Sequence, residues 1–263
     1  MNKRVLLHII LFVLIFGCNN TKDEKQVPFE KLSSDITGIN FSNIITPNIE
    51  TSENLFDYDY FYNGSGVGIA DINNDGLKDV LFTANQQMNR LFLNKGNLTF
   101  EDITELSNIN TKNKEWSSGV TFADVNNDGW LDIYISQGGP YDSNSRKNLL
   151  LINNQDLTFT EKAEEYGLDD NGISTQSAFF DFDKDGDLDC VVMNENEFYG
   201  YDPISFFKKY ENKSVLMKNS SHLYEQKDGK FINITEKAGL LSPTFGLGLC
   251  ISDINNDNWP DIY

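Results

Sequence analysis

The nine residues DINNDGLKD, at positions 71 to 79, place oxygen-bearing side chains at their first, third, fifth and ninth positions and a glycine at the sixth. Oxygen ligands at such short spacing suit a hard divalent cation such as Ca²⁺. A metal-free interpretation also exists, because Asp-Gly between two apolar runs is the commonest short-range signal for a β-hairpin turn. One copy of the motif is therefore compatible with both.

The motif recurs as DVNNDGWLD from residue 124, DFDKDGDLD from residue 181 and DINNDNWPD from residue 253. The first residues of successive copies lie 53, 57 and 72 residues apart, which indicates a supersecondary unit with variable insertions rather than a short fixed array. A turn needs only Asp-Gly or Asn-Gly. Four copies with oxygen at the same four positions therefore favour metal loops over metal-free turns.

Each copy is expected to supply four side-chain ligands and the main-chain carbonyl of its seventh residue. All-oxygen ligation excludes zinc and favours calcium over magnesium, which tends to keep its waters. The predicted calcium ligands are Asp71, Asn73, Asp75, Leu77 and Asp79 in the first copy; Asp124, Asn126, Asp128, Trp130 and Asp132 in the second; Asp181, Asp183, Asp185, Asp187 and Asp189 in the third; and Asp253, Asn255, Asp257, Trp259 and Asp261 in the fourth.

Two details refine this prediction. Position twelve is Phe82, Ile135 or Val192, whereas an EF-hand requires a glutamate there. In the fourth copy Asn258 replaces the glycine, and asparagine tolerates a left-handed conformation better than most residues. We therefore expect three complete calcium sites and a fourth that depends on Asn258.

Strand-like runs surround every loop. A small and apolar run precedes it and a β-branched or apolar run follows it, as in GVGIA before residue 71 and VLFT after residue 79. A second hairpin comes next, for example RLFLNKGNLTFEDIT at 90 to 104. Four short strands per unit are typical of a propeller blade. The sequence therefore predicts an all-β fold, a β-propeller of four-stranded antiparallel blades with calcium-binding loops and repeats around 64–109, 117–168, 174–240 and 245–263.

The loops and their flanks resemble FG-GAP or VCBS-type repeats, the calcium-loop blades of integrin-like β-propellers. The segment YFYNGSGVGIADINNDGLKDVLFTAN, from residue 60, also resembles the start of bacterial surface lipoproteins of the family that carries ASPIC/UnbV domains. The resemblance extends over nearly all of residues 29 to 263. It implies a binding or adhesion module.

Residues 28 to 39, PFEKLSSDITGI, resemble the outer-strand segments of the later repeats, such as FTEKAEEYGL. We expect them to form a strand that closes the ring by completing the blade begun at the C-terminus. The chain stops at Tyr263, inside a blade, with too few units for a closed ring of the usual size. We therefore expect an N-terminal fragment of a longer protein, with an incomplete ring.

The N-terminus is predicted to be a targeting segment. Lys3 and Arg4 precede an apolar stretch from 5 to 16 that is too short to span a bilayer comfortably. Its ending, LIFGC, resembles a bacterial lipobox, which predicts a signal peptide at 1–17, lipidation of Cys18 and a tether at 18–27. An ordinary signal peptide with an unrelated Cys18 is the alternative. The following NNTKDEK resembles an export signal, so we expect an outer membrane lipoprotein exposed on the cell surface, although a polar linker would look similar.

The net charge limits the classes of partner, and the positions of the cysteines indicate their role. The formal net charge of -19 disfavours nucleic acid and anionic lipid and makes divalent cations the natural counter-ions. Cys190 occupies the position that Val80 and Ile133 hold after the other loops, so we expect it to be buried and apolar. A disulfide between Cys190 and Cys250 is the alternative.

An enzyme finds little support. His222, the histidine left after removal of the signal peptide, is predicted to be a surface residue rather than a base. Most paired carboxylates fall in the metal loops, where a cation would keep them ionised and unable to act as general acids. A glycan-cleaving role for Asp169, Asp170 or Asp202 stays open.

Two connections opposite the calcium loops are enlarged, at 137–148 and 197–221. The second carries Lys208, Lys209 and the aromatic residues Phe198, Tyr199, Tyr201, Phe206, Phe207 and Tyr210. These aromatic residues either cover a small core of their own or form a recognition surface. We therefore predict a calcium-binding, surface-anchored module for an extracellular protein or glycan. The alternative is a noncatalytic scaffold whose catalytic or ASPIC/UnbV-type region lies beyond residue 263.

Overall fold

The computed structural model describes residues 29–111, 116–198 and 201–263. The predicted signal peptide at 1–17, the predicted lipidation site Cys18 and the predicted tether at 18–27 lie outside these ranges. The chain divides into residues 1–33 and a compact unit, Ser34–Tyr263, which contains every element described below. In the described ranges no helix is long and apolar enough to cross a membrane.

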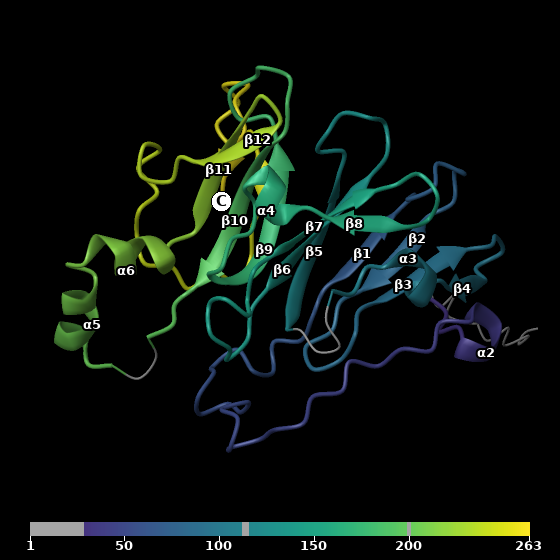
Figure 1. Ribbon diagram of the computed structural model, residues 1–263, viewed down its shortest axis with the longest axis horizontal. Helices are drawn as coiled ribbons and strands as arrows, with labels where there is room; N and C mark the ends of the chain where they lie inside the picture. Colours follow the sequence, from purple (N-terminus) through teal and green to yellow (C-terminus); the bar gives the residue numbers. More distant parts are fainter. Residues whose placement is uncertain (1–28, 112–115, 199–200) are drawn as a thin grey trace, which may run out of the picture. The chain divides into compact units, whose positions relative to one another are not determined.

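The fold is all-β, as predicted, with three four-stranded antiparallel sheets and one two-stranded hairpin in the described residues (Figure 1). In each four-stranded sheet the strands lie in chain order, each beside the next. The sheets are β1 (Val67–Ala70), β2 (Asp79–Phe82), β3 (Arg90–Asn94) and β4 (Phe100–Asp102); β5 (Ser117–Ala123), β6 (Asp132–Gln137), β7 (Leu149–Asn153) and β8 (Phe159–Glu161); and β9 (Ile173–Phe180), β10 (Asp189–Glu195), β11 (His222–Lys227) and β12 (Lys230–Asn233). The hairpin consists of β13 (Ile251–Ser252) and β14 (Asp261–Ile262). We refer to the three sheets as blades one to three.

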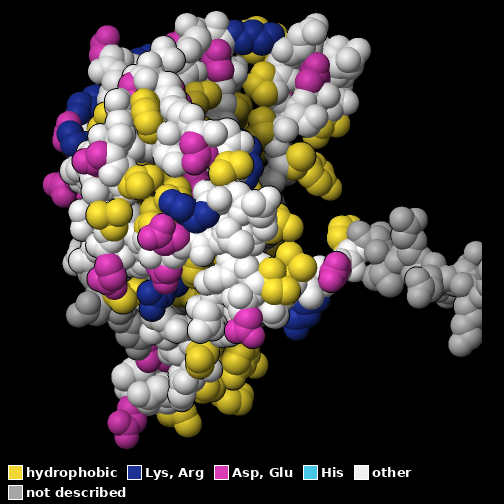
Figure 2. All heavy atoms as spheres, turned by 90° about the vertical axis from the view of Figure 1, so that its right-hand side faces the viewer, with side chains coloured by type: hydrophobic (Ala, Val, Ile, Leu, Met, Phe, Trp, Pro, Cys, Tyr) yellow, Lys and Arg dark blue, Asp and Glu magenta, His cyan; other side chains and the backbone are white. Residues whose placement is uncertain are grey.

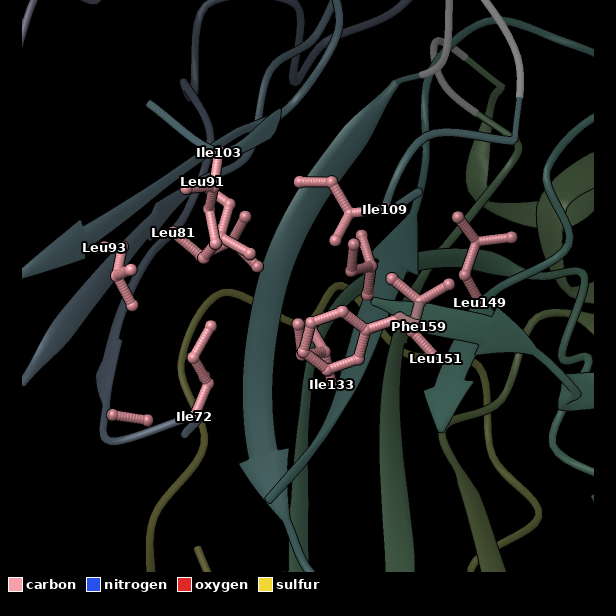
Figure 3. Packing of buried hydrophobic residues seen from close by; sticks show 12 residues of the cluster. Ile72, Leu81, Leu91, Leu93, Ile103, Ile109, Ile133, Leu149, Leu151 and Phe159 are labelled. Carbon is pink, nitrogen blue, oxygen red and sulfur yellow. The ribbon is translucent and has the colours of Figure 1, made fainter. Parts of the chain in front are cut away.

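The core lies between the faces of successive blades. Successive side chains of a strand point to opposite faces, so one strand can serve two interfaces. In blade two, Ile133 and Leu151 pair across β6 and β7 and pack towards blade one, in the cluster drawn in Figure 3. Their neighbours Tyr134 and Leu150 pack towards blade three. Every residue of β6 and β7 is consequently buried.

A short helix follows the outer strand of blades one and two: α3 (Thr104–Ser107) and α4 (Ala163–Tyr166). After α4, Gly167 adopts a left-handed conformation (φ 83°). A Cβ atom at Gly167 would lie 2.5 Å from the carbonyl oxygen of Phe231 in β12. The turn after α4 therefore packs directly on the outer strand of the next blade.

The prediction that residues 28–39 form a strand is wrong for the described part of that segment. Residues 34 to 37 form α2 (Ser34–Thr37), and residues 29–33 and 38–39 have no regular structure. Gly38 follows α2 with φ 76°, and its backbone abuts the carbonyl of Phe100 in β4. The segment thus resembles the end of blade two, where α4 is likewise followed by a left-handed glycine. Here the glycine packs against blade one. The described part of the segment contains no strand.

The long connection between β10 and β11 contains two helices, α5 (Pro203–Lys209) and α6 (Lys213–Lys218), which extend from the end of β10 (Figure 1). The side chain of Asp202 caps α5 by accepting the N–H groups of Ile204 and Ser205. Asn212 caps α6 in the same way. Both caps have a signal in the sequence, Asp202 followed by a proline and Asn212 at the start of Asn-Lys-Ser-Val, and neither helix was predicted.

Candidate metal centres

Each Asp-rich loop joins the first and second strands of a unit. The four loops connect β1 to β2, β5 to β6, β9 to β10 and β13 to β14, and the ninth residue of each begins the second strand. Loops that follow equivalent strands lie at the same end of their blades, so the four loops share one end of the fold. Acidic, basic and hydrophobic side chains are interspersed over the face shown in Figure 2.

In the first loop the side-chain oxygens of positions one and three converge. The N–H of Asp75 donates to Asp71 Oδ1 (3.1 Å) and to Asn73 Oδ1 (3.2 Å). The N–H of Gly76 donates to the second oxygen of Asp71, at 2.8 Å. The carboxylate of Asp75 accepts the N–H of Leu77. The second and fourth loops repeat these bonds around Asp124, Asn126 and Asp128, and around Asp253, Asn255 and Asp257.

Two residues of each loop must adopt a left-handed backbone. The sixth position does so at Gly76 (φ 86°), and Asn258 (φ 71°) keeps the same bend in the fourth loop. The fourth position does so as well, a requirement that the sequence analysis missed. Its residues are Asn74, Asn127, Lys184 and Asn256. Asparagine at this position in three loops was the signal, because asparagine is enriched in this conformation.

The ninth position ties the loop to the blade. Asp132 is almost fully buried, and its two oxygens accept the N–H groups of Val125 (3.1 Å) and Asn153 (2.8 Å). Burial raises the pKa of Asp132 to about 6, although these two N–H donors favour the carboxylate. A bound cation would keep such a group ionised. Asp79 and Asp189 have the same contacts, and in both burial raises the pKa of the carboxyl group.

The third loop shows the clearest cation geometry. Carboxylate oxygens of Asp181, Asp183 and Asp189 lie within 4.8 Å of one another. One oxygen of Asp181 and one of Asp187 are buried without a hydrogen-bond partner. In the other loops an Asn at position three donates to the carboxylate at position five, as Asn73 does to Asp75 at 3.0 Å, but Asp183 has no such proton. The donor set therefore fits Ca²⁺, which takes several oxygen ligands.

His222 is not a surface residue, and that prediction is wrong. It is only 7% exposed; its Nδ1 lies 2.5 Å from Asp170 Oδ2 and its Nε2 lies 2.8 Å from the carbonyl of Met217. The three carboxylates considered for glycan cleavage all have structural contacts. Asp170 holds His222, Asp202 caps α5, and Asp169 forms an ion pair with Lys147 at 2.7 Å.

The cysteine prediction is confirmed for Cys190, which is fully buried between blades two and three. The alternative, a disulfide with Cys250, is not formed: Cys190 is a free thiol in the interior and Cys250 is free and exposed. The hydrophobic thiol simply replaces an aliphatic side chain of the strand.

The aromatic residues of the 197–221 insertion were expected either to cover a small core or to form a recognition surface, and some of them contact one another whereas others are exposed. Phe206 stacks on Phe245 with ring centroids 5.9 Å apart and also contacts Tyr210. Lys209 Nζ lies 4.3 Å from the ring centroids of both Phe198 and Tyr201. These rings contact one another without being buried: Tyr201 is 49% exposed, Phe207 is 66% exposed, and Tyr199 lies outside the described residues. The insertion therefore combines ring contacts among half-exposed residues with an exposed apolar side of α5.

Comparison with known proteins locates an FG-GAP-like repeat at residues 58–135, which spans blade one and the start of blade two. The chain is also 29% identical over 170 residues to cartilage acidic protein 1 from Xenopus tropicalis. That alignment covers 64% of this chain and 25% of that protein. The chain therefore spans about a quarter of the length of the curated relative that it matches. The all-β blades, the loops between their first two strands and the matched residues together show that the chain contains an FG-GAP-like repeat.

Proposed function

We propose that this chain is a calcium-binding, cell-surface-anchored β-propeller that acts as a binding or adhesion module for an extracellular protein or glycan. The FG-GAP-like repeat at 58–135 supports a noncatalytic binding module in general. The observation that carries the calcium assignment is the third loop, where three carboxylates converge and a buried oxygen of Asp181 has no hydrogen-bond partner. Such an arrangement is unfavourable without a cation.

Binding of a partner would use the surface opposite the loops. The strand connections at that end carry the two helices α5 and α6, and Ile204 and Phe207 are the most exposed apolar residues on them. Lys208 lies beside them in the sequence, within a strongly acidic chain. An exposed surface that is both apolar and basic, carried on a connection between strands, is typical of recognition surfaces.

A second candidate is a noncatalytic scaffold domain within a larger protein, with a catalytic or ASPIC/UnbV-type region elsewhere. The observation in its favour is that the chain covers 25% of its relative. Both candidates require the calcium loops, so they share the first experiment below. They differ in whether the isolated chain binds a partner by itself.

Isothermal titration of the full chain with Ca²⁺ tests the metal assignment. Asp181→Asn keeps an oxygen that can accept the N–H of Gly186 but removes one charge from the converging cluster. We expect it to weaken or remove one calcium site. Asp156→Asn is the matched control, since Asp156 caps the β7–β8 turn and lies outside the motif. The assignment would be wrong if the unmodified chain released no calcium-dependent heat, or if both variants behaved alike.

Anchoring has a separate test. Cys18→Ser should release the protein from the membrane fraction of the producing cells, because the proposed lipid attachment atom is lost. A protein that still sediments with membranes after a salt wash would refute the lipid anchor and leave the calcium assignment intact.

A further inference from the structure

The first and second calcium loops are joined by hydrogen bonds between blades. Asn153 lies at the end of β7 in blade two and is 4% exposed. Its side-chain amide donates to the carbonyl of Ile72 in the first loop (2.8 Å) and to the carbonyl of Leu131 in the second (3.1 Å). Its own N–H donates to Asp132, the ninth residue of the second loop. Asn153 therefore contacts both loops from a buried position.

A second bond joins the same two loops near the surface. Asn74, the left-handed fourth residue of the first loop, donates its side-chain amide to the carbonyl of Gly129 at 3.0 Å. Gly129 is the sixth residue of the second loop, and its N–H donates to Asp124. The side-chain hydrogen bonds of Asn153 and Asn74, which we call the two bridges, thus end on residues that are themselves hydrogen-bonded to predicted ligands.

The hydrogen bonds from Asn153 continue within the first loop to its ninth residue, a predicted ligand. The N–H of Ile72 donates to Asp79, the ninth residue of the first loop, at 3.0 Å. The path therefore runs from Asp132 through Asn153 and Ile72 to Asp79. At the next boundary the corresponding residues, Asn127 and Gln226, make no hydrogen bond of this kind within the described part of the chain. Between the third and fourth loops, Lys184 Nζ lies 4.0 Å from the ring centroid of Trp259.

We propose that Asn153 and Asn74 couple the first and second calcium loops, so that calcium bound at either loop raises the affinity of the other. This inference rests on the proposed function, because it concerns the calcium sites named there. A cation that orders one loop also fixes the carbonyl or amide through which the other loop is held, so the second cation has less ordering to impose. The coupling is reciprocal by thermodynamic necessity.

The charges of the two loops are compatible with positive coupling, in which calcium at one loop strengthens binding at the other. The first loop carries three carboxylates, Asp71, Asp75 and Asp79, and the second carries three at the matching positions. The first loop also contains Lys78, so a bound Ca²⁺ leaves it with a formal net charge of zero and leaves the second loop with a formal net charge of −1. Repulsion between occupied loops is therefore not the dominant interaction, and the shared ordering decides the sign.

Glycine amides report each loop separately. The N–H groups of Gly76, Gly129 and Gly186 donate to the first aspartate of their own loops, so their NMR signals should follow calcium binding loop by loop. Asp128→Ala disables the second loop in the full chain. We expect it to raise the calcium midpoint observed at Gly76 by about fivefold or more. Asp185→Ala, which disables the third loop, should leave that midpoint within about twofold.

Matched variants test the two bridges. Asn94 in blade one makes the same local bonds as Asn153. Its side-chain amide donates to the carbonyl of Lys78, the eighth residue of its loop, and its side-chain oxygen accepts the N–H of Gly96 in the following turn. Among the residues that the structure describes, it makes no hydrogen bond to another Asp-rich loop. With Asn74→Gly and Asn153→Ala present, Asp128→Ala should no longer move the Gly76 midpoint. With Asn94→Ala present it should still do so. If the double variant folds poorly, Asn74→Gly alone serves as the test, because glycine preserves the left-handed backbone. It should reduce the shift of the Gly76 midpoint that Asp128→Ala causes.

Three outcomes are distinguishable. A Gly76 midpoint that ignores Asp128→Ala in the otherwise unmodified chain overturns the coupling while calcium binding stands. Equal effects of the Asn94 and Asn153 variants overturn the role of the bridge. Glycine signals that do not respond to millimolar calcium overturn the proposed function itself.

Discussion

His222 has an oxygen acceptor at each ring nitrogen, the Asp170 carboxylate and the Met217 carbonyl. A neutral imidazole carries one N–H and can donate to only one of them, so the imidazolium form satisfies both. Burial opposes the charge on each partner, but their mutual attraction outweighs it. The pKa of His222 is therefore raised above its ordinary value, and the pKa of Asp170, which also accepts the hydroxyl of Tyr224, is lowered.

The pair should make stability depend on pH. A raised histidine pKa contributes stability that is complete below about 6.5 and is lost as the pH rises through the folded-state value. A lowered aspartate pKa contributes stability above about 3.9 that is lost as the pH falls through its folded-state value. The free energy of unfolding, measured with denaturant, should therefore decline from pH 6 to pH 8.5.

His222→Gln should remove that decline and lower the stability at pH 6 by roughly 1.5 to 3 kcal/mol, the range for a hydrogen bond to a charged group. Equal pH profiles for the variant and the unmodified protein would contradict the assignment. The measurement is simplified because His222 is the one histidine in residues 29–111, 116–198 and 201–263.

The loops should differ in their dependence on calcium. The third loop carries carboxylates at all four side-chain ligand positions, whereas the others have an asparagine at the third position. Asp185→Ala should therefore reduce the calcium-dependent rise in melting temperature more than Asp257→Ala in the fourth loop. Thermal melts with calcium and with chelator measure the difference, and a larger effect of Asp257→Ala would contradict the ranking.

At the scale of elements, the strands and loops could be predicted because each is specified locally. Alternating apolar residues and a repeated turn define a blade without reference to the rest of the chain. The errors came where a distant partner decides the outcome. His222 is buried and hydrogen-bonded to Asp170, 52 residues earlier in the chain, and a strand at residues 29–33 would have required a partner strand from elsewhere in the fold. The hydrogen bonds of Asp79 and Asp132 to the third strand also depend on pairing within the folded blade.

The close packing of Gly167 against the next blade predicts that this glycine tolerates substitution less well than a glycine with free space around it. Gly167 and Gly229 both have a left-handed backbone, with φ of 83° and 73°. A Cβ at Gly167 would meet the carbonyl oxygen of Phe231 at 2.5 Å, whereas one at Gly229 meets nothing within 4 Å. Gly229→Ala should cost about 1 kcal/mol from backbone strain alone. Gly167→Ala should cost clearly more, because a backbone atom of the next blade must move.

Chemical denaturation of the two glycine variants checks this comparison. Similar losses would show that the turn after α4 can move away from β12 without disturbing the interface. A larger loss at Gly167 would instead show that each blade is held by the turn of its predecessor, the arrangement that α2 and Gly38 repeat against β4.

At the scale of the whole molecule, the three blades share their cores and the acidic loops gather at one end. The cluster between blades one and two contains Leu81 and Ile133, and the cluster between blades two and three contains Tyr134 and Val192. A disturbance at one blade therefore reaches its neighbour through packed side chains. The formal net charge of -19 adds repulsion that bound cations would relieve.

Calcium should consequently contribute a large part of the stability of the molecule. Two like unit charges about 4 Å apart repel by about 1 kcal/mol in water and about 4 kcal/mol at an intermediate dielectric, so the Asp181, Asp183 and Asp189 cluster should open without a cation. Extracellular modules bind calcium at roughly 10⁻⁴ to 10⁻³ M, and calcium at ten times Kd adds about 1.4 kcal/mol per site. Three sites would add about 4 kcal/mol to a stability of about 5 to 15 kcal/mol.

A chelator should therefore lower the melting temperature reversibly, and calcium should restore it. Magnesium at the same concentration should restore it less, because Mg²⁺ demands shorter, octahedral coordination and gives up its waters reluctantly. A monovalent salt at equal ionic strength is the control for simple screening of the carboxylates. If that salt or magnesium restored the melting temperature as fully as calcium, the loops would be responding to general charge neutralisation, and the assignment of calcium to the four Asp-rich loops would be wrong.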